Sequence, residues 1–475
     1  MAKGGITETF HRWTNLEGWV DWFGGWGISR ALTLLILFLG LYSILSLEIP
    51  NLTLFTLEWL IGTAPVWLPI SLLIGGWHVW IWYIQALYIA GRKPILLEMK
   101  IPREIAKSPR AMELAFASFS ISSGETTFFH RAWKGQVRPY FSFEIASFGG
   151  EIHFYIWCWD AYKETVEGAI YAQYPEVEIH EVEDYASKFN YQKGKYNAWG
   201  VEWPLMSYIK GLNWTFEINA YPIRTYVDFE LDKDPKEEFK IDPLGNVLEF
   251  MSNIKPNEQL WIQIVLRKSG KQDILNLTDR PDQDNRWKVM VEKEVEKLRT
   301  KAAIVSSSTL SEVYEELGEE EQDRRPPSPR PTWKQQRMME SMERNLGKYP
   351  FEVGARGIYW TEGELRGPIY TGFRWIWRPF GNPQYATHLR PRRWHCDFDY
   401  PWQDFNGIRW DNTTRRVLDA YRRRSFYHSP WILPTNVMTN EVLATIWHPP
   451  SATVQVPGLA RIPATKAEPP ANLPK

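Results

Sequence analysis

Two long apolar runs stand near the start of the chain. Ala31–Leu47 contains no charged residue, and Val66–Ala90 contains a single ionisable residue, His78. A helix needs about 20 mostly apolar residues to cross the hydrocarbon core of a bilayer, and only helices or closed barrels satisfy their backbone hydrogen bonds in lipid. The pattern therefore predicts a two-helix transmembrane hairpin over residues 31–93. The alternative is a pair of buried helices in a soluble core.

Basic residues flank the predicted hairpin on one side of the membrane only. The segment between the two apolar runs, Pro50–Pro65, has no lysine or arginine. Basic residues lie outside the two runs, at Lys3, Arg12, Arg30, Arg92 and Lys93. By the positive-inside rule, this asymmetry predicts a multi-pass protein with both termini in the cytoplasm. The lipid bilayer is then its first partner.

The residues around the two runs leave further alternatives. Met1–Arg30 carries large aromatic side chains among glycines and a few charges, which predicts a segment lying in the headgroup region, with a loose tail as the alternative. His78 is open to two interpretations. An ionisable residue inside a membrane is a functional candidate, whereas a neutral histidine beside Gly75 and Gly76 suits close helix packing.

Beyond the hairpin, short strands alternate with helices, which predicts an α+β fold. Within residues 94–200, the order strand–helix–strand–strand–helix–strand is that of a ferredoxin-like domain. Gly149-Gly150, between the two middle strands, is a hairpin signal. The predicted elements are the strands Ile95–Ile101, Tyr140–Phe148, Glu151–Trp157 and Val177–Val182, with one helix from Ser108-Pro109 and another over Asp160–Tyr174.

Residues 201–380 repeat this pattern in part and predict a second ferredoxin-like unit, related to the first by internal duplication. The predicted elements are the strand Thr225–Glu230, the helix Pro243–Ser252, the strand Gln259–Arg267, the helix Lys334–Leu346 and the strand Phe351–Tyr359. The joints from helix to strand also match, Tyr174-Pro175 in one unit and Tyr349-Pro350 in the other. The charged helix Arg286–Lys301 precedes an insertion, residues 302–332, whose serine, acidic and proline runs predict a mobile linker.

The last part of the chain is rich in arginine and tryptophan. Residues 381–436 predict an irregular extension with a basic helix, Arg415–Phe426, and residues 437–475 predict a proline-rich tail that starts with a short helix. The net charge of the whole chain is −1, so the local basic excess matters more than the total. Such an excess favours polyanions or lipid headgroups, or is simply a solvated face. The candidate polyanion-binding residues are Arg390, Arg392, Arg393, Arg415, Arg416, Arg422, Arg423 and Arg424.

The sequence offers little catalytic chemistry. None of its three Gly-Lys dipeptides is followed by serine or threonine, so the chain has no P-loop. His395 and Cys396 supply two candidate metal ligands, too few for a tetrahedral site. Two cysteines in 475 residues form no disulfide framework and fit a reducing compartment. We expect a protein that is not an enzyme, with no cofactor and no metal.

Several blocks of the sequence resemble a known family. They are SPRAMELAFAS, EIHFYIW, GAIYAQYPEVEIHEVEDY, QLWIQIVLR, FEVGARGIYW, LDAYRRRSF and the closing stretch from Leu433 to Pro474. Together they are similar to the membrane-anchored N-terminal region of the coupling-type ATPases of type IV secretion systems. In that family the closing stretch leads into a P-loop motor domain, and this chain ends at Lys475. The resemblance implies an anchor and platform without a motor: a natural split, a truncated fragment, or a module recruited for another role.

These expectations combine into a non-catalytic component of a bacterial inner membrane, part of a type IV secretion or conjugation-like apparatus for DNA transfer. The proline-rich tail is expected to dock a separate P-loop translocase ATPase, with a simple linker as the alternative. The candidate docking residues are Ile446, Trp447, His448, Pro449, Pro450, Pro469 and Pro470. Other secretion-system subunits and further copies of the chain, in an oligomeric ring, are the remaining expected partners. The alternatives are a DNA-binding membrane protein, in which Trp394 and Tyr421 stack bases, and a structural subunit of another envelope machine.

Overall fold

Two apolar helices open the described part of the chain. A computed structural model describes residues 30–49, 51–103, 105, 107–121, 127–209, 213–215, 220–233, 241–270, 287–300, 331–383, 387–395 and 401–462. Helix α3 spans Arg30–Glu48 and α4 spans Leu52–Ala90. Among these described residues, α4 alone is long and apolar enough to cross a membrane. The predicted headgroup segment, most of the 302–332 insertion and the last part of the tail lie outside the described residues.

Helix α4 begins earlier than the second apolar run. The segment predicted to lie between the spans, Pro50–Pro65, is helical from Leu52 onwards, and α4 continues through Pro65 and Pro69. At 1.5 Å per residue, its 39 residues extend for about 58 Å, nearly twice the hydrocarbon thickness of about 30 Å. Only part of α4 can therefore lie in the hydrocarbon core. A hydrogen bond of 2.6 Å between the hydroxyls of Tyr42 and Thr56 joins α3 to α4.

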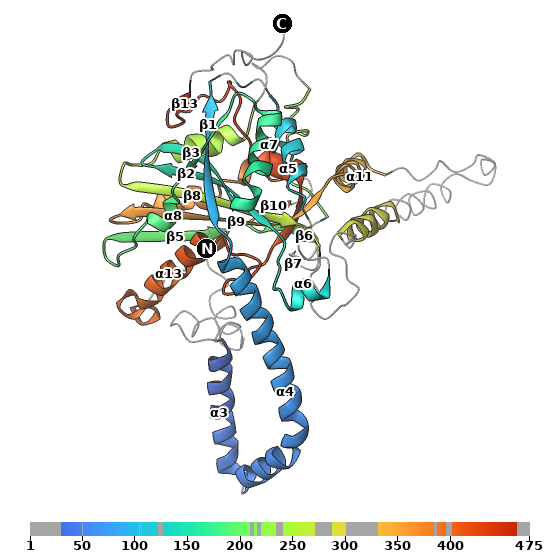
Figure 1. Cartoon of the computed structure of the whole chain (residues 1–475), viewed down its shortest axis with the longest axis vertical. Helices are drawn as coiled ribbons and strands as arrows, with labels where there is room; N and C mark the ends of the chain where they lie inside the picture. Colours follow the sequence, from blue (N-terminus) through green and yellow to red (C-terminus); the bar gives the residue numbers. More distant parts are fainter. Residues whose placement is uncertain are drawn as a thin grey trace, which may run out of the picture. The chain divides into compact units, whose positions relative to one another are not determined.

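A large, mainly antiparallel sheet forms the centre of the remaining chain (Figure 1). Its strands are β1 (Pro94–Pro102), β2 (Tyr140–Phe148), β3 (Glu151–Trp159), β4 (Glu178–Val182), β5 (Tyr196–Glu202), β8 (Glu258–Lys268), β9 (Pro350–Glu362), β11 (Arg392–Arg393), β12 (Asn436–Thr439) and β13 (Arg461–Ile462). The order is β11-β5-β9-β8-β2-β3-β1-β13, while β4 also pairs with β1 and β12 with β9. Every pairing is antiparallel except that of β13 with β1. A smaller sheet has the order β10-β6-β7, formed by Thr387–Leu389, Leu205–Ile209 and Asn213–Thr215.

The helices divide between two compact units of the chain. Besides α3 and α4, the described helices are α5 (Pro109–Ser118), α6 (Phe128–Ala132), α7 (Lys163–Gln173), α8 (Tyr185–Lys188), α9 (Leu244–Ser252), residues 287–300, α11 (Trp333–Leu346), α12 (Gly367–Arg374), α13 (Ile408–Arg422) and α14 (Asn440–Ile446). One unit comprises Met1–Ile84 and Trp394–Ala420, with α3 and most of α4 and α13. The other comprises Gln85–Arg393 and Tyr421–Lys475, with the sheets and the remaining helices.

The main sheet is covered on both faces, so its central strands are buried throughout. In β2, Phe143 packs against Phe116 of α5, with ring centroids 4.8 Å apart. The neighbouring residue, Glu144, is fully buried and contacts Tyr185 of α8 instead. Successive side chains of a strand point to opposite faces, so α5 and α8 cover opposite faces of the sheet. Strands that are buried on both faces have nearly continuous apolar sequences. The apolar runs in the sequence therefore predict these central strands.

Most of the predicted strands are present, but one is wrong. Thr225–Glu230 forms turns in place of a strand. The carboxylate of Asp228 accepts a hydrogen bond of 2.9 Å from the backbone N–H of Thr225. An aspartate that bonds nearby backbone favours a turn over an extended strand. The strand beside β9 is instead β5, which also pairs with the edge strand β11, and the predicted boundary between the units at residue 200 falls inside β5.

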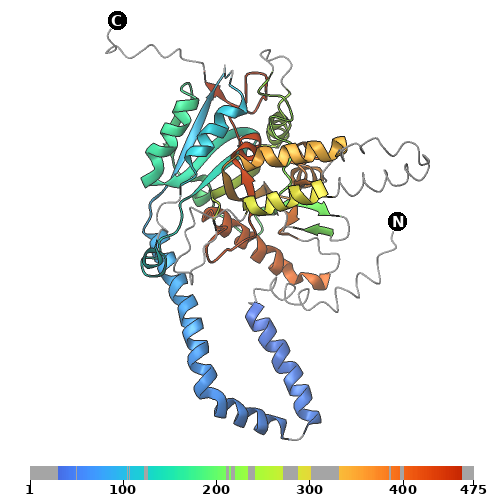
Figure 2. The same ribbon diagram turned by 90° about the vertical axis from the view of Figure 1, so that its right-hand side faces the viewer.

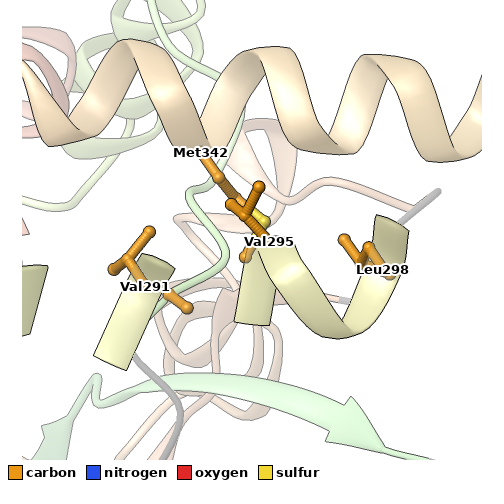
Figure 3. Packing of buried hydrophobic residues seen from close by; sticks show 5 residues of the cluster. Val291, Val295, Leu298 and Met342 are labelled. Carbon is orange, nitrogen blue, oxygen red and sulfur yellow. The ribbon is translucent and has the colours of Figure 1, made fainter. Parts of the chain in front are cut away.

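A pair of helices flanks the insertion predicted over residues 302–332. Residues 287–300 and α11 lie side by side (Figure 2). Their contact is apolar: Val291, Val295 and Leu298 pack with Met342 of α11 (Figure 3). The first turn of α11 is closed by a capping box between Thr332 and Gln335, which satisfies two backbone N–H groups. The charged helix predicted in front of the insertion is thus confirmed and has an apolar face.

Candidate functional site

The eight arginines predicted to bind a polyanion differ in exposure. Arg392, Arg393, Arg415, Arg416 and Arg423 are exposed, Arg390 and Arg422 are half-buried, and Arg424 is buried. They also belong to different compact units, because Arg415 and Arg416 lie in the unit with α3, and the others lie in the unit with the sheets. The prediction of one basic site therefore divides into separate local arrangements.

Two of the exposed arginines lie on the edge strand β11. Arg392 pairs with Glu202 of β5, and Arg393 with Val201. The backbone N–H of Arg390 donates a hydrogen bond of 2.9 Å to the carbonyl of Pro204, which holds the start of this strand in place. Arginines exposed along a sheet edge are able to contact phosphate oxygens without reading a base sequence.

Arg422 and Arg424 bind the protein itself, which corrects their assignment to a polyanion site. The guanidinium of Arg422 donates to the backbone carbonyls of Ala186, at 2.9 Å, and Phe189. The side chain of Arg424 is 0% exposed. Its Nε donates to Glu144 at 2.9 Å, and its two Nη atoms donate to Asp184 at 2.5 and 2.8 Å. A fully buried guanidinium bound to two carboxylates is not available to a phosphate.

Glu144 is the centre of this buried charge cluster. Besides Arg424, its carboxylate accepts hydrogen bonds from the hydroxyl of Ser142 at 2.7 Å, the amide of Gln263 at 2.9 Å and the hydroxyl of Tyr185 at 2.7 Å. Glu144 and Gln263 are paired residues of β2 and β8. The cluster therefore stands where the two middle strands of the sheet meet, and it ties the segment after α13 to that point.

Electrostatics in the cluster favour the charged forms of the paired groups. Burial alone would raise the pKa of Asp184, but the hydrogen bonds and charge of Arg424 outweigh burial and lower it. Burial alone would lower the pKa of Arg424, but Glu144 and Asp184 raise it well above its ordinary value. Burial and the nearby charge of Glu144 raise the pKa of Tyr185, so its hydroxyl keeps its proton and remains a donor. These shifts favour an ion pair between Arg424 and Asp184 beside a protonated Tyr185.

A lone charge inside an apolar strand was the signal that sequence reasoning missed. Glu144 stands in the middle of YFSFEIASF, and Gln263 stands in the middle of QLWIQIVLR. Charged side chains are rarely fully buried unless they are paired. In a central strand, Glu144 and Gln263 are therefore each expected to bind another polar side chain in the interior.

The docking residues predicted in the tail are mostly buried, which corrects that assignment as well. Ile446, Trp447, His448, Pro449 and Pro450 all lie in the interior. The indole of Trp447 packs against the rings of Phe143 and Phe154, at 4.8 and 5.7 Å between centroids. His448 bonds to Asp242 at 2.9 Å. The start of the predicted tail is thus part of the core, while Pro469 and Pro470 lie outside the described residues.

A second buried ionic group, which the sequence pattern did not indicate, ties α11 to α5 and α14. Lys348, just after α11, binds Glu113 of α5 at 2.5 Å and lies 3.7 Å from Glu441 of α14. Arg344 of α11 also binds Glu441, at 3.0 Å. Both carboxylates are buried. These contacts join the helix pair beside the insertion to the helices that cover the sheet.

The residues considered for metal binding are placed only in part. His395 is buried and its Nε2 lies 3.0 Å from the hydroxyl of Thr414, while Cys396 lies outside the described residues. Burial lowers the pKa of His395 to about 3. Over the described ranges, no group of three or more histidine, cysteine, aspartate or glutamate side chains is arranged to hold a metal ion. In α4, Nδ1 of His78 lies 2.8 Å from the carbonyl of Ile74, which leaves both interpretations of His78 standing.

Comparisons with known proteins return no relative. No protein-family model, no curated protein and no solved structure matches this chain.

Proposed function

We propose that the chain is a non-catalytic component of a bacterial inner membrane that anchors a separate DNA-translocase ATPase in a type IV secretion or conjugation-like apparatus. The observation that carries this proposal is the chain connection between α4 and β1. Gly91–Lys93 alone separates the end of the apolar helix from the first strand of the main sheet. A candidate membrane span joined so closely to a large sheet is suited to hold a platform at the membrane surface.

In this proposal α3 is the second membrane-crossing helix of a hairpin, with both ends of the chain in the cytoplasm. The hydroxyl contact between Tyr42 and Thr56 supports a hairpin, because it ties the two helices together beside their connection. Large apolar side chains along both helices are exposed, among them Phe38 and Leu73. Exposed apolar surface of this extent marks a membrane or partner contact, and lipid would cover it.

The platform in this proposal is built from two ferredoxin-like units joined edge to edge. The order β4-β1-β3-β2 supports the first unit, because a ferredoxin-like domain places its first and third strands in the centre. The order β11-β5-β9-β8 supports the second, with the helix pair and the insertion placed between β8 and β9. The antiparallel pairing of β2 with β8 would then join equivalent strands of the two units, as a local two-fold relation requires.

Docking of the ATPase is assigned to the last residues of the chain, with Pro469 and Pro470, because the earlier candidates are buried. Extended proline-rich segments suit docking since they lose little conformational freedom on binding. The test is purification of the native complex in mild detergent, with the bound proteins identified by mass spectrometry. We expect a P-loop translocase in stoichiometric amount, and its loss when residues 463–475 are deleted.

A chain lacking residues 302–330 is the control for this deletion, because it removes another proline-containing segment at a different place in the chain. It should retain the ATPase. A native complex that contains other envelope subunits but no P-loop ATPase would contradict the proposal and identify a structural subunit of another machine.

DNA binding is a second candidate function, favoured by one observation. Arg392 and Arg393 are exposed side by side on the edge strand β11, with Arg390 next to them. Single-stranded DNA should then bind with an affinity that falls steeply as the salt concentration rises. Binding to the Arg392→Gln/Arg393→Gln variant should be weaker and less dependent on salt. Absence of binding by the parent chain at low salt would end this candidate.

A further inference from the structure

A short segment in front of α13 exposes three large apolar side chains. Trp402, Phe405 and Ile408 are 69%, 71% and 38% exposed. They stand at intervals of three residues, in two short turns and the first residue of the helix. Single exposed apolar residues are ordinary on a soluble protein, but a concentrated group of them marks a contact with another surface.

The backbone of this segment is held in place by its own hydrogen bonds. The carboxylate of Asp404 accepts from the backbone N–H groups of Arg409, at 2.8 Å, and Trp410, at 3.0 Å. The guanidinium of Arg409 donates to the carbonyl of Gln403 at 2.7 Å. A contact made by side chains on a segment already ordered costs little additional conformational entropy.

The surroundings of the segment identify the surface. It belongs to the compact unit that contains α3 and most of α4, the candidate membrane span. Helix α13 exposes two basic residues, Arg415 and Arg416. Aromatic side chains followed by basic residues are typical of segments that lie at the boundary between headgroups and acyl chains. Because the candidate membrane span belongs to the same compact unit, a lipid surface is the occupant that best fits this segment.

We propose that residues 402–416 form an interfacial membrane contact, in which Trp402, Phe405 and Ile408 enter the headgroup region and Arg415 and Arg416 bind lipid phosphates. This inference rests on the membrane association proposed above. It adds a second place, more than 300 residues after α4 along the chain, at which the protein meets the bilayer.

The depth of residue 405 in a membrane tests the proposal. A nitroxide is attached to Phe405→Cys in the full-length chain with Cys396→Ser, while Cys158 is retained because it is buried. The chain is placed in nanodiscs of phosphatidylcholine and phosphatidylglycerol, and the accessibility of the label to oxygen and to a water-soluble nickel complex is measured. The control is Ile432→Cys, since Ile432 is 72% exposed and lies in the other compact unit.

We expect the label at 405 to collide more with oxygen than with nickel, and the label at 432 to show the reverse. Arg415→Gln/Arg416→Gln should move the 405 label toward water. A 405 label as accessible to nickel as the 432 label, in chains that have entered nanodiscs, would overturn the interfacial contact and leave the anchor standing. Chains that do not enter nanodiscs would overturn both. Protection of the 405 label by single-stranded DNA, and not by lipid, would overturn the proposal in favour of a nucleic-acid contact.

Discussion

Replacing Arg424 by methionine tests whether the buried charge cluster holds the sheet together. Methionine keeps much of the apolar stem and removes the guanidinium, so Glu144 and Asp184 lose their charged donor. The side chain of Glu144 is 0% exposed and that of Asp184 is 23% exposed, so water compensates the second carboxylate better than the first. Breaking a buried ion pair costs about 3–5 kcal/mol. The compact unit that holds the cluster, Gln85–Arg393 with Tyr421–Lys475, is larger than about 250 residues, so at about 2 °C or less per kcal/mol the melting temperature should fall by roughly 5–10 °C.

The measurement is thermal unfolding of the full-length chain in nanodiscs, monitored by the fluorescence of its tryptophans. Arg423→Met is the control, because the neighbouring arginine is exposed and its loss should change stability by about 0.5 kcal/mol or less. The double variant with Glu144→Gln should lose less stability than the sum of the two single variants, by about 1–3 kcal/mol. Equal melting temperatures for Arg424→Met and Arg423→Met, or strictly additive losses, would refute the reasoning.

Three further predictions concern other parts of the sheet unit. Trp447→Ala should lower the free energy of unfolding by about 3–5 kcal/mol because it empties a buried site. A variant that keeps its stability but no longer binds the ATPase would instead support the original docking prediction for Trp447. Gly354→Ala should destabilise the protein by about 1–3 kcal/mol, because the new methyl group would lie 2.3 Å from the ring of Phe426. Gly168→Ala in α7 meets nothing within 4 Å and should stabilise the protein. Thermal unfolding of both variants shows whether the melting temperature falls in the first and rises in the second. The hydrogen bond of His153, in β3, lowers the pKa of Glu98 from 4.5 to about 2. The stability that this contact supplies is therefore present above about pH 4.5 and is lost as the pH falls toward 2. Glu98→Gln should therefore flatten the acid side of the stability profile, and an unchanged profile would contradict this.

The first half of the sheet was predictable because its signals are local. Gly149 and Gly150 connect β2 to β3 with φ values of +60° and +98°, which glycine adopts without strain. A side chain at Gly150 would also meet the carbonyl oxygen of Ser252 at 2.6 Å. The same two glycines that mark a turn in the sequence thus permit the close approach of another segment. Strand length, alternation and turn residues were sufficient here.

The placement of charge was not predictable, because the partners are distant along the chain. Arg424 and Glu144 are 280 residues apart, so the arginine-rich helix looks like a free basic surface when only its own sequence is considered. The local pattern reveals that Arg422 and Arg424 are basic, but it does not reveal that the folded chain supplies backbone carbonyls to Arg422 and two carboxylates to Arg424. Prediction of the polyanion site failed at these two positions for that reason.

Proline content misled in a related way. The run His448-Pro449-Pro450 predicts an extended chain, and the backbone leaves the helical conformation at Trp447 as expected. An extended backbone does not imply that the segment is exposed to solvent, because backbone conformation and burial are independent. An extended segment is buried without penalty when its few polar groups find partners, and both ring nitrogens of His448 do so, at Ala444 and Asp242. Local conformation was therefore predictable at this point, whereas burial depended on tertiary contacts.

The Arg424 cluster also holds the segment that follows α13, inside the unit that contains the sheets. Two helices run from one unit into the other: α4 leads into β1, and α13 leads into the segment that contains Arg424. The second connection ends at the pair formed by Glu144 of β2 and Gln263 of β8, in the middle of the sheet. A surface pair at this place would contribute at most about 1 kcal/mol, too little to fix the end of a helix. The fully buried guanidinium of Arg424, bound to the carboxylates of Glu144 and Asp184, holds the segment after α13 within the unit that contains the sheets.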